Sequence, residues 1–567
     1  MFQQILDPLF GSLALSALVA VIPLATLFVL LGVFRVKAWK ASLVGLVLSM
    51  LLAVAVWRMP VPQVVSGSLE GALYGIVPIL WILVNALWVY RLTVVTGWFE
   101  VLGDRIRAIS DDQRILAIII AFCFGALLES LAGFGAPVAI SIAMLIAAGM
   151  APVKAAVVSL LANTAPVAFG AMAAPIIALS GVTGIDIHLL SQMAGRQTPF
   201  LAVFVPLILV FIVDGWRGVR QTWPVATVAG VAFAVSQFIT SNFIAVEITD
   251  VVAAVVTVIA VLVTLKFWTP RSTVAFEPAI ADANAGSAVG ATVPTTGGKT
   301  ATTVVKVADA TRIDRSGRTP ANLTWNAVMP YVVIIAVFSI SQLPPVKAFL
   351  AEHATLTFAW PGLDVSDSSG EAVATVFKLG YIGTGGTLLL LSGIIVALLY
   401  RLPARRALEA YGATLHQLRF TIVTVVSVLA LAYVMNLSGQ THTLGAALAA
   451  TGGFFALLSP AIGWLGVAIT GSDTSSNALF GLLQATTAQK VGLDPVLMAA
   501  TNSSAGVLGK MLSPQNLAVA AAAAGMAGKE GDLFRKLLWW SLGLLIVFTG
   551  LVYLQSTPIL GWMVPTP

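Results

Sequence analysis

Long apolar runs, separated by short polar or charged segments, fill most of this sequence. A helix of about 20 apolar residues spans the hydrocarbon core of a bilayer, so each long run predicts a membrane helix. The predicted spans are 10–34, 43–57, 73–90, 115–131, 199–213, 225–243, 251–268, 327–340, 384–400, 420–435, 444–458 and 537–554. With two further regions between them, the pattern predicts an all-α polytopic membrane protein of about 12–14 membrane segments.

A thirteen-residue pattern occurs twice, once in each half of the chain. The first copy, residues 163–175, reads NTAPVAFGAMAAP, and the second copy, residues 502–514, reads NSSAGVLGKMLSP. The copies share four residues at identical spacing: Asn163 and Asn502, Gly170 and Gly509, Met172 and Met511, and Pro175 and Pro514. The distribution of basic residues places the entries to the two copies on opposite sides of the membrane. This predicts two inverted repeats with broken or re-entrant helices, a design found in secondary transporters.

The composition supports a membrane protein and narrows its partners. The 567 residues are 59% hydrophobic and 10% charged, whereas soluble chains average about 25% charged residues. The formal net charge of +6 comes from basic residues placed singly or in small groups between apolar runs. That distribution sets orientation in a lipid bilayer and argues against nucleic-acid binding. Placing the basic groups in the cytoplasm predicts that both termini are periplasmic.

A stretch of small, glycine-rich residues at 279–303 is predicted to be a flexible cytoplasmic linker between the two halves. The predicted division is N-terminal scaffold helices (1–114), a first repeat core with broken helices (115–198), scaffold helices (199–268), the linker region (269–325), scaffold helices of the second half (326–440), a second repeat core with broken helices (441–528) and a C-terminal helix (529–567).

The first repeat core contains a carboxylate followed by a helix break. Glu129 lies in an apolar run, where a charge at the helix centre costs roughly 2.5–3.5 kcal/mol. Gly133 and Gly135 interrupt the helix, and Pro137 suits the first turn of the next helix. The free N–H groups of a helix starting near Gly135 and Ala136 favour an anion. We therefore predict a proton-coupling role for Glu129 and substrate contact at Gly135 and Ala136; a structural salt bridge of Glu129 is the alternative.

The second repeat core contains TGSDTSSN at residues 470–477 between apolar flanks. Consecutive polar residues at membrane depth cannot face lipid, and Ser, Asp and Thr favour helix N-termini. The segment therefore predicts a second broken helix, with Asp473 as a second proton-coupling carboxylate. The predicted substrate-binding residues here are Thr474, Ser475, Ser476 and Asn477. A polar turn at the membrane surface is the alternative.

The two copies place further polar side chains in apolar surroundings. Those predicted to bind substrate are Asn163, Thr164, Asn502, Ser503 and Lys510. Lys510 stands where the first copy has Ala171. Three roles are open for it: counter-ion for Glu129 or Asp473, direct partner of an anionic substrate, or a lysine whose ammonium group reaches the membrane interface. Arg196, in the stretch GRQTPF, is a further candidate because a guanidinium binds a carboxylate through two hydrogen bonds; a loop position is its alternative.

The sequence contains no zinc-ligand spacing, phosphate-binding loop, serine-hydrolase elbow or haem motif. We therefore do not expect an enzyme, and we predict no metal and no cofactor.

Six stretches together resemble the bacterial L-lactate permease family: ESLAGFGAP, ANTAPVAFGAM, GRQTPF, VDGWRG, TGSDTSSNALF and GKMLSPQ. The resemblance runs from about residue 6 to the C-terminus. Ser130 and Leu131 depart from it, because smaller residues are typical of the family there. The resemblance implies a multi-pass protein of the bacterial inner membrane that takes up L-lactate with protons, and D-lactate and glycolate as well. It also implies a superfamily of inverted-repeat transporters, several of which move by an elevator motion.

These lines of argument predict a proton symporter of small 2-hydroxymonocarboxylates, with the lipid bilayer as its other partner. Coupling to Na⁺ and transport of another small monocarboxylate remain alternatives, and a membrane receptor or channel for a small organic anion is a more distant one. The oligomeric state stays open, a homodimer included.

Overall fold

The computed structural model describes residues 2–566 apart from 132, 134, 271, 274–319, 374 and 527. The predicted linker at 279–303 lies outside the described residues. Within them, ten helical stretches are long and apolar enough to cross a membrane. Four shorter apolar helices accompany them: Ala136–Ala147, Pro152–Ala162, Gly170–Thr183 and Gly385–Leu399. The prediction of an all-α polytopic membrane protein with broken helices is confirmed; the inverted relation of the two halves and the predicted division into parts stay predictions.

The N-terminal half contains one short strand and a long series of helices, several of which are π-helical or contain residues outside helical geometry. In chain order the elements are β1 (Phe2–Gln3), α1 (Leu13–Ala20), α2 (Ile22–Phe28), η1 (Val29–Val33), α3 (Ala38–Ala55), α4 (Val61–Tyr74), η2 (Gly75–Leu80), α5 (Trp81–Val95), α6 (Trp98–Arg107), α7 (Gln113–Leu116), η3 (Ala117–Phe124), α8 (Gly125–Leu131), α9 (Ala136–Ala147), α10 (Pro152–Ala162), α11 (Gly170–Thr183), α12 (Ile187–Ala202), α13 (Val205–Phe243) and α14 (Thr249–Phe267).

The C-terminal half adds three short strands and the second set of helices. They are α15 (Pro320–Ser341), α16 (Pro344–His353), β2 (Thr355–Ala359), β3 (Val365–Ser366), β4 (Val376–Gly380), α17 (Gly385–Leu399), α18 (Ala404–Ser438), α19 (Gln440–Leu448), η5 (Ala449–Phe454), α20 (Phe455–Thr470), α21 (Asp473–Val491), α22 (Pro495–Lys510), α23 (Pro514–Ala523), α24 (Glu530–Gln555) and η6 (Gly561–Met563).

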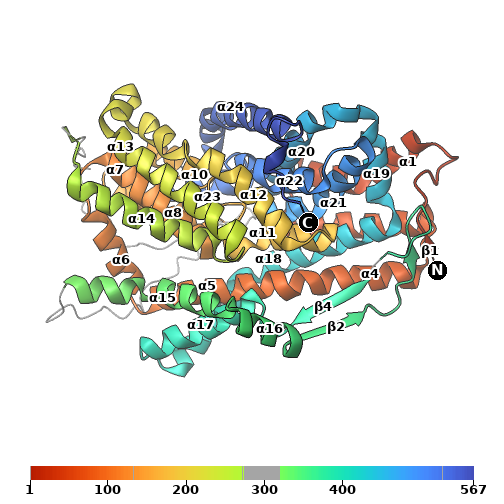
Figure 1. Cartoon of the computed structure of the whole chain (residues 1–567), viewed down its shortest axis with the longest axis horizontal. Helices are drawn as coiled ribbons and strands as arrows, with labels where there is room; N and C mark the ends of the chain where they lie inside the picture. Colours follow the sequence, from red (N-terminus) through yellow and green to blue (C-terminus); the bar gives the residue numbers. More distant parts are fainter. Residues whose placement is uncertain are drawn as a thin grey trace.

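The helices separate into two regions with long helices between them (Figure 1). α15, α16, α17 and the β2–β4 hairpin lie along the lower edge of the view, and α12–α14 and α20–α24 lie above. α18 runs through the middle and packs on α3, α4 and α5. The two halves of the chain meet inside the upper region, where α11 packs on α21, α12 on α22, and α9 on α23.

The small strands tie the N-terminus to the second half. β1 pairs with β3 in parallel, with Phe2 opposite Val365 and Gln3 opposite Ser366. β2 and β4 form an antiparallel pair with Thr355 opposite Gly380. These strands lie at the end of the molecule where α4 begins, beside the N-terminus (Figure 1).

A buried cation stabilises a break in the long helix α13. The backbone leaves helical geometry at Asp214 and at Gly215, whose φ of 62° and ψ of −155° suit glycine alone. Arg114 is buried and binds both carboxylate oxygens of Asp112, with Nη2 2.7 Å from Oδ2. Its Nη1 lies 3.0 Å from Asp214 Oδ2. The guanidinium therefore links the start of α7 to the break in α13.

Candidate functional site

The first predicted helix break lies among buried residues. α8 ends at Leu131, and α9 begins at Ala136 after Gly135, whose φ of 84° lies in the left-handed region that glycine adopts without cost. Pro137 stands in the first turn of α9, where a missing N–H costs nothing. The remaining N–H groups and the positive end of the α9 dipole lie at a buried position suited to an anion.

The second predicted break has the same form. α20 ends at Thr470, Gly471 adopts a φ of 74°, and the Ser472 side chain accepts a hydrogen bond from the backbone N–H of Ser475. α21 then begins at Asp473. The polar residues of its first turns, Asp473, Thr474, Ser475, Ser476 and Asn477, are all buried. The segment is therefore packed inside the protein rather than being an exposed turn.

Lys510 and Glu129 form a buried ion pair that joins the two halves of the chain. Nζ of Lys510 lies 2.5 Å from Oε1 of Glu129, and the two side chains are 8% and 2% exposed. Glu129 Oε2 is buried and has no hydrogen-bond partner among the described residues. In this structure Lys510 is therefore the counter-ion of Glu129, and it is buried rather than extended to the membrane interface. Direct contact between Lys510 and a substrate stays a prediction. The pair also shows that Glu129 has the salt bridge that the sequence left open.

The first copy of the repeated pattern packs directly around Glu129. A Cβ atom placed on Gly170 would lie 3.1 Å from Glu129 Oε1 and 3.2 Å from its Cγ. The next three residues, Ala171, Met172 and Ala173, have φ values of 46°, 53° and 59°. Left-handed geometry costs roughly 1–2 kcal/mol for each non-glycine residue, and such strain gathers at functional sites. The backbone around Glu129 is therefore held in an unusual conformation by its surroundings.

The second copy differs from the first in backbone as well as in side chains. α10 ends before Asn163, and the first copy is irregular up to Gly170, whereas α22 continues through Asn502 to Lys510. The second copy leaves the helix only at Met511–Ser513, before α23 begins at Pro514. The first copy therefore interrupts regular helix over much of its length, and the second copy only at its end.

Asp473 is buried near the ion pair. Its Oδ2 accepts a hydrogen bond of 2.6 Å from the Ser503 hydroxyl, while Oδ1 has no partner among the described residues. Lys510 is close enough for its charge to act on Asp473. The site therefore contains two buried carboxyl groups, of which Glu129 is ion-paired with Lys510 and Asp473 is hydrogen-bonded to Ser503.

Amide side chains connect the helix that follows the second break to the two copies of the repeated pattern. The Asn477 amide donates to the Pro175 carbonyl of the first copy over 3.0 Å, and its oxygen accepts from Asn502 Nδ2 over 2.9 Å. Asn502 Nδ2 also approaches Ser476 Oγ at 3.4 Å, and Asn502 Oδ1 accepts from Gln484. Asn502 and Asn477 therefore lie side by side and hold the first turn of α21 against the first copy.

Several buried polar atoms at these helices lack partners within the described part of the chain. Both amide atoms of Asn163 are unpartnered, as is the hydroxyl of Ser504, whereas Thr164 donates to the Leu161 carbonyl over 2.7 Å. Buried polar groups are almost always hydrogen-bonded. Together with Glu129 Oε2 and Asp473 Oδ1, these atoms mark places suited to a small polar ligand or to water.

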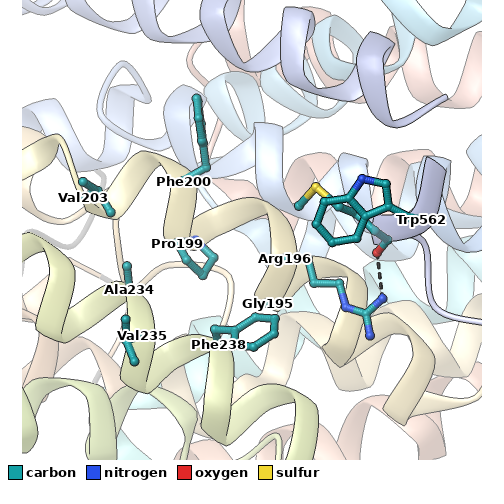
Figure 2. Close-up of a pocket in the computed structure, with 10 residues that line it drawn as sticks. Gly195, Arg196, Pro199, Phe200, Val203, Ala234, Val235, Phe238 and Trp562 are labelled. Atoms are coloured by element: carbon teal, nitrogen blue, oxygen red, sulfur yellow. Dashed lines mark hydrogen bonds between the residues drawn. The ribbon is translucent and has the colours of Figure 1, made fainter. Parts of the chain in front are cut away.

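Arg196 has different partners from the other predicted residues. It donates to Asn242 Oδ1 over 2.9 Å and to the Met563 carbonyl over 2.8 Å. Figure 2 shows it beside Trp562 at one side of a groove of about 560 Å³, whose other labelled residues are almost all apolar. The structure thus brings Arg196 to the C-terminal segment, on α12 rather than in a loop, and shows no contact between it and Glu129, Asp473 or Lys510.

Sequence reasoning assigned no role to another buried carboxyl group, Asp250. It lies in the first turn of α14 and is fully buried. Its Oδ1 accepts from Gln237 Nε2 over 2.9 Å. The signal in the sequence was its position directly before the apolar run at 251–268. The described residues contain no group of three or more His, Cys, Asp or Glu that could hold a metal ion.

Comparison with known proteins identifies the relatives of this chain. Residues 16–559 match the family model described as L-lactate permease. An L-lactate permease of Bacillus subtilis is 41% identical, with all of both chains covered. The glycolate permease GlcA of Escherichia coli K12 is also 41% identical over 98% of both chains, and an L-lactate permease of the same organism is 38% identical over all of both. A solved structure of MtrF from Neisseria gonorrhoeae aligns with 14% identity and a TM-score of 0.43, covering 87% of this chain and 84% of that one.

Proposed function

Because this chain belongs to the L-lactate permease family, we propose that it imports L-lactate together with a proton across the bacterial inner membrane, and carries D-lactate and glycolate in the same way. Its named relatives are permeases, so it is a transporter rather than an enzyme. Coupling to protons has an energetic reason. Moving a lactate anion inward against an inside-negative potential costs about 2.3 kcal/mol per 100 mV, and a proton moving with it cancels that cost.

The ion pair between Lys510 and Glu129 is the observation that carries the proposal. Without substrate, the two buried charges cancel. Lactate entering alone would add an unbalanced negative charge, and a proton binding to Glu129 alone would leave Lys510 without a counter-ion. Each imbalance costs several kcal/mol at a buried site. Binding of both restores neutrality, because Glu129 becomes a neutral acid and Lys510 pairs with the lactate carboxylate. Proton and substrate are therefore expected to bind and move together.

The surrounding groups suit the rest of the ligand. The N-termini of α9, at Gly135 and Ala136, and of α21, at Thr474 to Ser476, offer backbone N–H groups to a carboxylate. The substrate hydroxyl is assigned to the amide and hydroxyl side chains of Asn163, Thr164, Asn477, Asn502 and Ser503, of which Asn163 has both amide atoms unpartnered. A 2-hydroxymonocarboxylate uses both kinds of contact.

Asp473 is proposed as the second proton-coupling group. One of its oxygens accepts from Ser503 and the other is unpartnered among the described residues. The charge of Lys510 also acts on Asp473, although its ion pair is with Glu129. When Lys510 turns to the substrate, Asp473 therefore loses this favourable charge as well. A proton on Asp473 then avoids a second uncompensated charge.

Lactate uptake into proteoliposomes tests the proposal. Glu129→Gln keeps the shape of the side chain and mimics the protonated state, so lactate binding and exchange at equal pH on both sides should persist. Accumulation driven by a pH gradient should be lost. Glu352→Gln, at an exposed carboxylate of α16, is the control and should behave as wild type. Normal pH-driven accumulation by Glu129→Gln would refute the coupling role, and accumulation that follows a Na⁺ gradient at equal pH would favour the sodium alternative.

The orientation rests on the basic loops and is tested separately. We propose that both chain ends face the periplasm, because the clusters at residues 35–40, 105–114 and 401–406 are basic. The native Cys123 is buried, so a cysteine introduced at Thr566 should dominate labelling. A membrane-impermeant maleimide should modify it on intact spheroplasts. Labelling only after lysis would reverse the orientation.

A further inference from the structure

Asp250 is a buried carboxyl group for which the ion pair at Lys510 gives no role. It is fully buried in the first turn of α14. Oδ1 accepts from Gln237 Nε2 over 2.9 Å, and Oδ2 has no partner within the described part of the chain. No ion pair formed by the described residues includes Asp250. An ionised carboxylate without a cation is costly at such a depth, so the group is suited to holding a proton.

Hydrogen bonds connect Asp250 to the first copy of the repeated pattern. Gln237 Nε2, which donates to Asp250, also approaches the Ala165 carbonyl at 3.3 Å. Gln237 Oε1 accepts from the Thr198 hydroxyl over 3.1 Å, so the orientation of the amide is determined by its neighbours. Asp250 is thereby held beside the irregular segment that follows Asn163, whose own amide atoms are unpartnered.

Glu129 is the charged group that acts on Asp250. α14 packs against α8, which carries Glu129, and against η3, α11, α13 and α15. Apart from Glu129, the titratable residues of η3 and of the described part of α15 are Cys123 and Tyr331, and α11 has none. α13 faces Asp250 with the neutral Gln237. Two negative charges repel each other at this depth, so Asp250 and Glu129 are expected to share one proton rather than ionise together.

The position of Asp250 indicates from which side of the membrane the proton shared with Glu129 arrives. α14 begins directly after the segment at 244–248, where Glu247 is partly exposed. The segment contains no Lys or Arg, whereas Arg217 and Arg220 follow the break in α13 and Lys266 lies in the last turn of α14. In the proposed orientation the segment therefore lies on the periplasmic side. Asp250 thus lies at the outward end of α14, and Glu129 is reached from it across the α8–α14 contact.

We propose that Asp250 is the group that receives the proton from outside and passes it to Glu129. The inference rests on the proposed proton symport. In the step, the O–H bond of Asp250 breaks, its proton binds a carboxylate oxygen of Glu129, and the electron pair stays on Asp250. Glu129 becomes neutral and releases Lys510 for the substrate carboxylate, while the Asp250 carboxylate accepts a hydrogen bond from Gln237. A proton from external water then restores Asp250.

Asp250→Asn separates this role from a structural one. Asparagine keeps an oxygen that accepts from Gln237 but cannot carry the proton. The expected result is normal exchange of labelled lactate at equal pH, with pH-driven uptake slowed about tenfold or more, and partial recovery in Asp250→Glu. The matched control is Glu247→Gln, three residues away. Burial raises the pKa of Glu247, so this carboxyl group also favours its protonated form and resembles Asp250 in that respect. Glu247→Gln should leave both exchange and pH-driven uptake unchanged.

The outcomes distinguish this inference from the proposed function. If Glu129→Gln abolishes pH-driven uptake and Asp250→Asn does not, the relay is refuted and the symport proposal stands. If neither variant changes pH-driven uptake, the proposed coupling itself fails. Loss of exchange together with uptake in Asp250→Asn would assign the residue a structural role and overturn the relay.

Gln237→Leu gives a second test should Asp250→Asn fail to fold. It removes the donor to Asp250 and leaves the carboxyl group. The Asp250 carboxylate then loses its stabilising N–H, so the group should hold its proton more tightly. The external pH for half-maximal uptake should move upward by a measurable fraction of a unit. An unchanged pH profile in a folded, active Gln237→Leu protein would overturn the relay.

Discussion

The ammonium group of Lys510 lies 2.5 Å from the carboxylate of Glu129, although 381 residues separate them in the sequence. Each side chain comes from a different half of the chain, and each is buried. Neither charge is tolerable there without the other, so the contact ties the fold to the proposed transport cycle. Its strength can be measured without any assumption about transport.

A double-mutant cycle should reveal strong coupling between these two residues. Lys510→Met leaves Glu129 buried without its cation, and removing one partner of a buried pair costs about 3–5 kcal/mol. Glu129→Gln alone leaves Lys510 unpaired and should cost a similar amount. The double variant should regain much of that loss, because no unpaired charge remains. Unfolding of the purified protein in detergent measures the effect; single-variant losses that simply add would contradict the ion pair.

Gly170→Ala should disturb Glu129 without changing any charged residue. The added Cβ would stand 3.1 Å from Oε1 and 3.2 Å from Cγ of Glu129. Overpacking of this kind typically costs about 1–3 kcal/mol, and displacement of the carboxylate should also lower pH-driven lactate uptake. The control is Gly412→Ala in α18, where nothing lies within 4 Å of the added atom. That change should be neutral or stabilising, since alanine favours helix. Equal effects of the two substitutions would contradict the proposed contact.

Asn477→Ala should weaken the contact between the first copy and α21. The change removes the donor to the Pro175 carbonyl and the acceptor for Asn502. The Pro175 carbonyl and Asn502 Nδ2 each lose a buried hydrogen bond, which together should cost about 1–3 kcal/mol. Thr424→Ala, which removes an exposed hydroxyl bonded within its own helix, should change stability by less than about 0.5 kcal/mol. A thermal shift of Asn477→Ala no larger than that of the control would show that this amide does not hold the first copy against α21.

Replacement of Arg114 by lysine should lower the stability of the protein. Its guanidinium reaches Asp112, Asp214 and Gln221 at once, and a single ammonium group cannot reproduce that geometry. Both Arg114→Lys and Arg114→Met should lower stability, the latter by about 3–5 kcal/mol because it leaves buried carboxylates unpaired. Arg405→Ala breaks an exposed pair with Glu409 and should cost less than about 1 kcal/mol. A stable Arg114→Lys protein would contradict this assignment.

The positions of the helix breaks could be predicted because their causes are local. Gly135 with Pro137, and Gly471 with Ser472, combine a left-handed residue with a helix-starting residue, and the structure begins α9 and α21 there. Arg196 and Asp250 could not be interpreted in the same way. Arg196 was considered a carboxylate partner or a loop residue, and its partners are Asn242 and the Met563 carbonyl. Asp250 lies at the edge of an apolar run in the sequence, and only the packing of α14 on α8 and α13 buries it.

The sequence by itself determined that this chain is a polytopic helical membrane protein, and it located the two breaks and the repeated pattern. Lipid requires apolar runs of about 20 residues, and both that requirement and the preference of glycine for left-handed geometry can be read from neighbouring residues. Only the tertiary structure decided that Lys510 pairs with Glu129, that Asn477 reaches Pro175, and that Asp250 is buried beside Gln237. Each of these contacts joins different helices, and two of them join the two halves of the chain. Which polar groups meet inside a membrane protein depends on how those helices pack.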